Sequence, residues 1–242
     1  MENDLFKQAI NPHQYDTNAL AWEKEGVKDS PTRRFLQEYL RKHLVINGKR
    51  VLDVGSGIGQ LFPLLKELGA IKIEGIEPSV QNVESSLATY PDIPVFQGTL
   101  LEAPIESLYD VIIAVMVFEH IDNILNALDK INSMLTADGT FALIVANKEY
   151  HLMPRFDYKI ESQNLEDGEV VIKTIRPHGI GTLYDILRPL ENYLSSANKK
   201  GFKLEKHIEL KPTDDLIKTE PKYTQFAHMS IHHLMIFKKS LT

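Results

Sequence analysis

The chain has 242 residues, 43% of them hydrophobic, a formal net charge of −6 and no cysteine. The length and apolar content suffice for one α/β domain with an insertion, so we expect a single domain over residues 1–242. The lack of cysteine excludes disulfides and thiolate chemistry, and the lack of a basic stripe argues against a nucleic-acid partner. No signal-peptide pattern or membrane-length apolar run is present, so we expect a cytoplasmic protein without membrane contact.

Predicted helices and strands alternate from residue 30 onward. Ser30 and Pro31 mark the start of a helix that ends near Asn47-Gly48, and residues 1–46 are predicted to form an N-terminal helical cap. Periodicity then predicts strands at 51–54, 71–76, 93–96, 110–116 and 140–146, with helices at 61–68, 79–89 and 122–135. This alternation is typical of a mostly parallel sheet with helices on both faces.

The ends of two of these elements carry turn and cap signals. Asp122 is the expected N-cap of the helix that follows it, and Asp138-Gly139 is the expected turn before the fifth strand.

The alternation stops after Asn147. Residues 148–190 are rich in glycine and proline around a β-prone stretch at 170–175, and we interpret them as an insertion or lid over the ligand-binding edge of the sheet. A helix at 190–199 and strands at 202–210 and 231–237 complete a predicted seven-stranded sheet.

The most informative motif is Val-Leu-Asp-Val-Gly-Ser-Gly-Ile-Gly at 51–59. Its glycines follow a strand and open a helix, which lets the chain turn tightly beneath a ligand. Glu77 ends the next strand, where a carboxylate accepts hydrogen bonds from ribose hydroxyls. Gln60 stands where the dinucleotide fingerprint Gly-x-Gly-x-x-Gly has its third glycine. Asp53 suits a ligand that carries an ammonium and a sulfonium better than it suits a pyrophosphate.

With this motif the chain resembles class I S-adenosylmethionine (SAM)-dependent methyltransferases, especially the ubiquinone/menaquinone-biosynthesis-like and natural-product subgroup. Further matching segments are 75–79, 109–120, 135–139 and 201–202. The resemblance implies a Rossmann-like fold and methyl transfer from SAM, with S-adenosylhomocysteine as the product.

The resemblance also implies a set of cofactor-binding residues. Gly55, Ser56 and Gly57 would cradle the methionine part beside Asp53, and Glu77 would bind the ribose. The remaining contacts would come from Pro78, Thr99 and Leu100 at the adenine, Val115 and Met116 under the methyl group, and Tyr15 and Arg34 at the cofactor carboxylate.

The histidines leave alternatives open. His120 and His178 are candidate general bases. The alternatives, which the pattern favours, are that His120 packs at a helix start and that His178 lies in solvent. Some relatives hold a divalent cation with Glu-x-x-Glu-His, but Met116 replaces the first ligand here, so we expect no metal. Tyr184 and Arg188 are expected to join His178 in one wall of the acceptor pocket. His232 and His233 are expected on the surface or on an edge strand.

These observations favour a methyltransferase that acts on a small molecule by in-line displacement at an O-, N- or C-nucleophile. A non-catalytic partner protein with the same fold and a dinucleotide-dependent oxidoreductase are the alternatives. The sequence leaves the acceptor, and the choice between monomer and homodimer, open.

Overall fold

The computed structural model describes residues 5–16, 30–105, 107–154, 158–175 and 181–240. Its main sheet has seven strands in the order β3-β2-β1-β4-β5-β10-β9, with β10 antiparallel to both of its neighbours and the strands from β3 to β5 parallel. The strands are β1 (Arg50–Val54), β2 (Lys72–Glu77), β3 (Val95–Gln97), β4 (Tyr109–Val115), β5 (Leu135–Ala146), β9 (Phe202–Leu210) and β10 (His232–Lys239).

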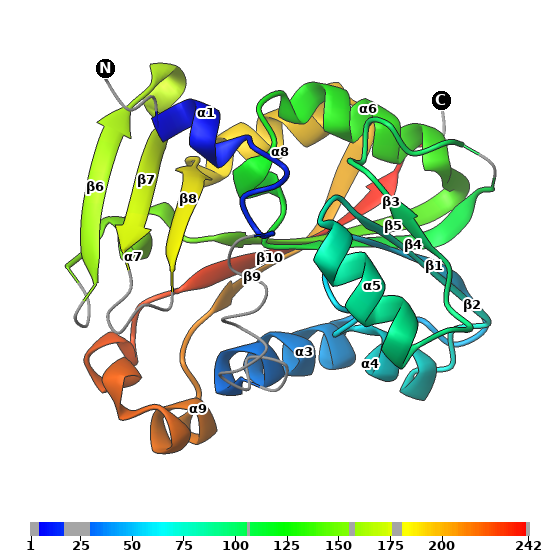
Figure 1. Ribbon diagram of the computed structural model, residues 1–242, viewed down its shortest axis with the longest axis horizontal. Helices are drawn as coiled ribbons and strands as arrows, with labels where there is room; N and C mark the ends of the chain where they lie inside the picture. Colours follow the sequence, from blue (N-terminus) through cyan, green and yellow to red (C-terminus); the bar gives the residue numbers. More distant parts are fainter. Residues whose placement is uncertain (1–4, 17–29, 106, 155–157, 176–180, 241–242) are drawn as a thin grey trace.

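Helices cover both faces of this sheet, as Figure 1 shows. Because side chains alternate along a strand, Val51 faces one helix layer and Leu52 faces the other. The first layer contains α3 (Pro31–His43), α4 (Phe62–Glu67) and α9 (Asp214–Thr219), and the second contains α6 (Ile124–Met134) and α8 (Leu190–Lys199). The helix α5 (Val80–Thr89) packs beside β2 and β3.

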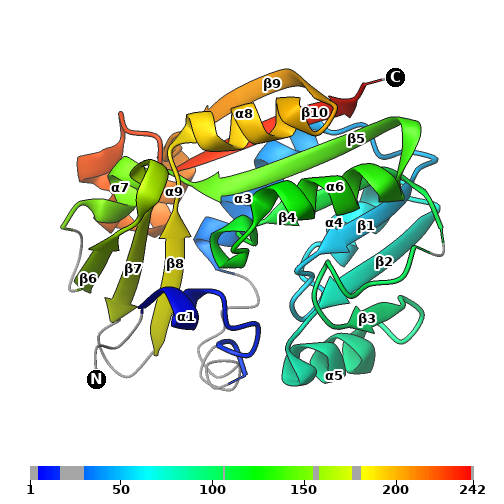
Figure 2. The same cartoon turned by 90° about the horizontal axis from the view of Figure 1, so that it is seen from above.

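The chain after β5 forms a second sheet. It begins with the short helix α7 (Lys148–Leu152) and continues as an antiparallel sheet of β6 (Lys159–Asn164), β7 (Val170–Ile175) and β8 (Thr182–Leu187). The N-terminal helix α1 (Leu5–Ala9) packs on this second sheet, and Figure 2 shows both at one end of the main sheet. Short 3-10 turns lie at Phe118–His120, Glu166–Gly168 and Pro221–Phe226.

The predicted fold class and the alternation of elements are confirmed, with three local corrections. Asn123, not Asp122, caps α6, because its side chain accepts the Asn126 N–H at 3.1 Å. The predicted turn at Asp138-Gly139 lies inside β5, where the pairing with β4 shifts register. Strands β6 and β8 were not predicted, since only 170–175 has a strongly β-prone composition.

The expectation for His232 and His233 is wrong. Strand β10 is paired on both sides, and the two residues are only 6% and 8% exposed. The alternating pattern placed them correctly on opposite faces but carried no information about strand order. Among the described residues, no helix has the length and apolar character needed to cross a membrane.

Candidate functional site

A cavity of about 650 Å³ lies at the carboxyl ends of β1, β2 and β4 and extends to the second sheet. One part, which we call the glycine-loop half, is lined by residues 55–58 together with Asp53, Glu77 and Arg33. The other, the second-sheet half, is lined by His120, Tyr150, His151, Tyr158, Thr174, Asp185 and His232. Open α/β sheets bind ligands at this edge.

The glycine loop is held open by backbone geometry that favours glycine. Gly55 has φ +69°, and a Cβ there would lie 2.4 Å from Val117 Cγ2. Gly57 has φ +55°, and its N–H donates to Glu77 Oε2 at 2.8 Å. A side chain at Gly55 would therefore be both strained and in collision.

Glu77 is a buried carboxylate that organises the loop. Besides the Gly57 N–H, it accepts the Ser79 N–H at 3.0 Å and the Asn82 amide at 3.1 Å, both on Oε1. Burial raises the pKa of Glu77, and these three hydrogen bonds oppose the rise. Glu77, the residue expected to bind the ribose, therefore already accepts hydrogen bonds from the protein itself.

Asp53 lies below the loop and is 2% exposed. Burial, together with the charge of Glu77, raises the pKa of Asp53 to about 8, and Arg33 opposes that rise. Asp53 Oδ2 and Ser56 Oγ are buried and have no hydrogen-bond partner within the described part of the chain. Buried polar atoms of this kind call for a polar ligand.

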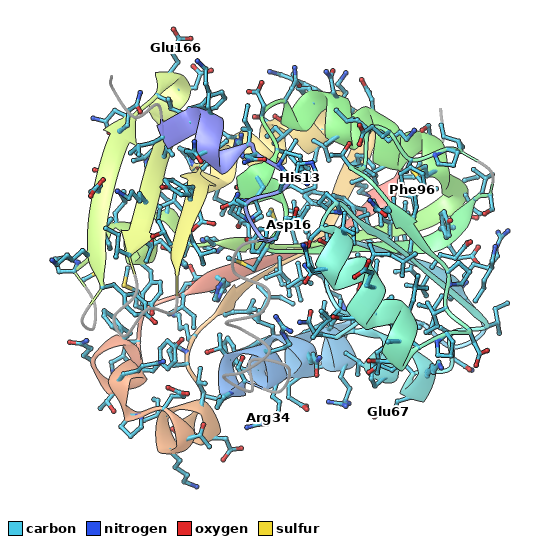
Figure 3. The ribbon with its side chains drawn as sticks, in the orientation of Figure 1. His13, Asp16, Arg34, Glu67, Phe96 and Glu166 are labelled. Carbon is cyan, nitrogen blue, oxygen red and sulfur yellow. The ribbon has the colours of Figure 1, made fainter. Side chains whose placement is uncertain are left out.

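Of the two neighbouring arginines, Arg33 lines the cavity and Arg34 does not; Lys222 also belongs to the lining. Arg33 lies one helical turn or two from the lining residues Leu36, Gln37 and Leu40, whereas Arg34 is exposed and points outward in Figure 3. Burial lowers the pKa of Arg33, and Asp53 opposes this shift. The helical period of α3 carried this information, because residues i, i+3, i+4 and i+7 share one face.

Only one of the three residues expected at the adenine lines the cavity. Pro78 lines the cavity, but Thr99 and Leu100 do not belong to its lining. The N–H and the hydroxyl of Thr99 donate to Glu102 Oε2, at 2.8 and 2.7 Å, and Leu100 packs in the core. The short polar residue at 99 thus closes a local turn.

Val115 and Met116 line the cavity as expected. Met116 has φ +57°, which is uncommon for a residue with a side chain, and its N–H donates to Ile144 O at 2.9 Å. Such strain persists where the surroundings fix the backbone, and it concentrates at functional sites.

The N-terminal segment meets His120, which ends the 3-10 turn after β4, at the second-sheet half. Tyr15 Oη lies 2.6 Å from His120 Nε2, and Gln14 Nε2 lies 3.2 Å from His120 Nδ1. Asp185 Oδ1 is 3.7 Å from His120 Nε2. Burial lowers the pKa of His120, although Asp185 opposes the shift. Tyr15 was expected at the cofactor carboxylate, but its hydroxyl forms a hydrogen bond with His120.

Glu119 and His120 do not converge on one point. Glu119 is fully buried and accepts the Ala146 N–H at 2.6 Å on Oε1, and burial raises its pKa to about 7. His120 faces Tyr15 instead. Within the described ranges, no group of three or more metal-ligating side chains is found.

The expected acceptor wall is only partly in place. His178 lies outside the described residues. Tyr184 packs on the far face of β8, against the cluster around Leu5 and Ile186, and is not part of the cavity lining. Arg188 is 2% exposed and donates to the carbonyls of Phe118, Ile121 and Asp122 and to Glu169, so it anchors the second sheet.

Sequence reasoning missed Thr174 and Asp185. Asp185 and Leu183 share the cavity face of β8, so the alternation that excludes Tyr184 selects Asp185. Thr174, opposite Leu183 on β7, is 4% exposed, and its hydroxyl has no partner among the residues that the structure describes. Finding these residues required the strand β8 to be recognised.

The fold and the site are those of an α/β protein with a cavity at a glycine loop. The model of a methyltransferase domain family matches residues 29–205, and the chain belongs to this family. Residues 29–205 therefore form a methyltransferase domain.

Three individual proteins that this chain resembles share less than a third of their aligned residues with it. The mitochondrial ubiquinone biosynthesis O-methyltransferase of Dictyostelium discoideum is 27% identical over 123 residues, which are 45% of this chain and 38% of that protein. The chain thus spans well under two thirds of that relative. A SAM-dependent methyltransferase from Mesorhizobium loti has a similar fold, with a TM-score of 0.66 and 18% identity over 83% of this chain and 96% of the other. The glycopeptide N-methyltransferase MtfA, solved with SAM, gives a TM-score of 0.59 at 15% identity over 83% and 91%.

The residues present fit SAM. Asp53 Oδ2 and Ser56 Oγ are buried acceptors that lack a partner in the described structure, and the methionine part of SAM carries an ammonium group. Gly55 leaves space that a Cβ would fill. The buried Arg33 supplies the positive charge that a carboxylate needs.

Proposed function

We propose that this methyltransferase transfers the methyl group of SAM to a nucleophilic atom of a small molecule by in-line displacement. The observation that carries the proposal is that one cavity runs from the glycine loop to the second sheet. Its volume, about 650 Å³, falls in the range of small-molecule sites. A donor and a small acceptor can therefore share one continuous cavity.

In this proposal the glycine-loop half binds the cofactor. Asp53 and Ser56 hold the ammonium group, Arg33 holds the carboxylate, and Pro78 contacts the adenine. Glu77 accepts a ribose hydroxyl on Oε2, which within the described residues accepts the Gly57 N–H alone. The second hydroxyl is accepted at Oε1 once the Asn82 amide, now 3.1 Å away, turns outward.

The second-sheet half would bind and orient the acceptor. Thr174, Asp185 and His232 supply polar contacts, and Tyr150 and Tyr158 supply aromatic ones. SAM brings a methyl group on a sulfonium, which is already a good leaving group. The protein's task is to align the nucleophile and exclude water, and orientation alone lowers barriers by several kcal/mol.

Calorimetry and a product assay test the proposal. SAM is expected to bind with a micromolar Kd, roughly −7 to −8 kcal/mol. S-adenosylhomocysteine formation is then measured with catechol, 4-hydroxybenzoate, phenethylamine and benzoate as acceptors. Binding of NAD in place of SAM would support the oxidoreductase alternative. SAM binding without turnover of any acceptor would support the non-catalytic one.

A further inference from the structure

The side-chain amide of Gln14 has a fixed orientation. Its Oε1 accepts the backbone N–H of Tyr184 at 3.3 Å, and its Nε2 donates to the backbone carbonyl of Ala9 at 2.9 Å. Reversing the amide would set a donor against a donor and an acceptor against an acceptor. Gln14 is 8% exposed, so water offers little compensation for that loss.

The surroundings of His120 bear on where its proton lies. The Gln14 amide directs an N–H to His120 Nδ1 at 3.2 Å, and the backbone carbonyls of Ala9 and Tyr184 also lie within hydrogen-bonding reach of the ring. We assign the Gln14 contact as the one that Nδ1 accepts, so that Nδ1 carries no proton. The neutral imidazole then has its single proton on Nε2. Nε2 faces Tyr15 Oη at 2.6 Å and Asp185 Oδ1 at 3.7 Å. His120 is thus a hydrogen-bond donor toward the cavity and lacks a free basic nitrogen there.

Asp185 is the carboxylate that lies beside His120. Its side chain is 13% exposed and lines the cavity, and the alternation of β8 directs it away from the α1 layer. His232 also lines the cavity, but it lies on β10, which β5 separates from β4. Asp185, in contrast, lies beside His120 in the 3-10 turn that follows β4, with 3.7 Å between Asp185 Oδ1 and His120 Nε2.

We propose that Asp185 is the general base of the transfer and that His120 is a positioning residue that holds Tyr15 and Asp185 in place. The inference rests on the proposed function and concerns an acceptor with a protic O–H or N–H group. The acceptor's heteroatom forms a bond to the methyl carbon while the carbon–sulfur bond breaks, and that bond's electrons stay on sulfur. The acceptor's proton passes to the Asp185 carboxylate, which later releases it to solvent.

The tautomer of His120 is measurable without any substrate. In protein labelled with 15N-histidine, His120→Gln identifies the His120 signals, and His43→Gln is the matched variant outside the cavity. We expect a neutral Nε2–H form with a pKa below the ordinary histidine value, because His120 is buried. Gln14→Glu replaces the donor at Nδ1 by an acceptor, and it should move the proton to Nδ1 and raise the pKa of His120. A wild-type His120 protonated at Nδ1, or titrating near its ordinary pKa, overturns the proposal.

Kinetics with the best acceptor of the panel test the two roles. Asp185→Asn should lower kcat by about 100-fold or more, remove the rise of kcat at acidic pH and leave the Kd for SAM unchanged. Because glutamine can both accept and donate, His120→Gln should recover most of the activity that His120→Ala loses. The His43→Gln enzyme should match the wild type.

The outcomes separate this proposal from the function on which it rests. An Asp185→Asn enzyme with a normal kcat, or a His120→Gln enzyme as inactive as Asp185→Asn, contradicts the base assignment alone. Failure of every acceptor with wild-type protein contradicts the proposed function and the base assignment together.

Discussion

Asp53 is a carboxyl group that is almost completely buried, so the free energy of unfolding should depend on pH in the range where Asp53 titrates. Its pKa in the folded protein, about 8, is above the ordinary value of 3.8, because of burial first and Glu77 second. Between these values the folded state holds a proton that the unfolded state has released. The stability of the free protein therefore falls as pH rises from about 4 to 8.

The same linkage acts on cofactor binding with the opposite sign. If Asp53 pairs with the ammonium of SAM, binding favours the ionised carboxylate and releases a proton near pH 7. The affinity for SAM should then increase from pH 6 to about 8 and level off where the free α-amino group loses its own proton, near 7.7–8.0. Asp53→Asn should weaken SAM binding, remove this pH dependence and raise the melting temperature of the free protein at pH 8.

Calorimetry in buffers of different ionisation enthalpy measures the proton release directly. Ser86→Ala is a matched control, because Ser86 Oγ is also buried without a partner in the described structure but does not line the cavity. A Kd for SAM that is flat from pH 6 to 8 in wild-type protein would show that Asp53 keeps its proton in the complex.

At the scale of elements, α7 links the main sheet to the second-sheet half of the cavity. Asn147 Oδ1 caps α7 by accepting the Tyr150 N–H at 2.9 Å, so its Nδ2 faces His233 Nε2 at 3.0 Å and donates. His233 then donates from Nδ1 to His207 Nε2 at 3.1 Å. A chain of hydrogen bonds that is buried at Asn147 and His233 and ends at the exposed His207 thereby fixes the helix α7.

Asn147→Ala should uncouple this helix from the sheet. The lost cap costs about 0.5–2 kcal/mol, and the melting temperature should fall by about 2–4 °C for each kcal/mol. The KM for the acceptor should rise several-fold, because Tyr150 and His151 line the acceptor side, while the Kd for SAM stays within twofold. Thermal melts, calorimetry and steady-state kinetics measure the three quantities.

The matched control is Asn123→Ala, which removes the cap of α6. Asn123 Oδ1 accepts the Asn126 N–H at 3.1 Å, and α6 packs on the face of the sheet away from α3. A similar loss of stability without a change in KM is expected. Equal effects of both variants on KM would mean that general destabilisation, not α7, controls the acceptor site.

For the whole molecule, the sequence predicted the half of the site that is built from local signals. The glycine loop, Glu77 and Met116 follow strands whose periodicity is strong, so their shared edge could be deduced. Arg33 and Asp185 were missed because each depends on which face an element turns to the cavity. The link from Gln14 to His120 spans 106 residues, and no local pattern reports a contact of that separation.

Because the cavity has two halves, the two ligands should protect different parts of the molecule from hydrogen exchange. SAM at 100 times its Kd stabilises the folded state by about 2.7 kcal/mol, which corresponds to a rise of about 5–11 °C in the melting temperature. Only the glycine-loop half contacts the cofactor in our proposal, so hydrogen exchange should slow at residues 53–60, at 77–82 and in α3. Strands β6 to β8 form their own sheet and pack with α1, so their exchange should change little with SAM alone and slow only when SAM and acceptor are both present. Hydrogen–deuterium exchange with mass spectrometry resolves these segments. Equal protection of β6 to β8 by SAM alone would show that the second sheet belongs to the cofactor site.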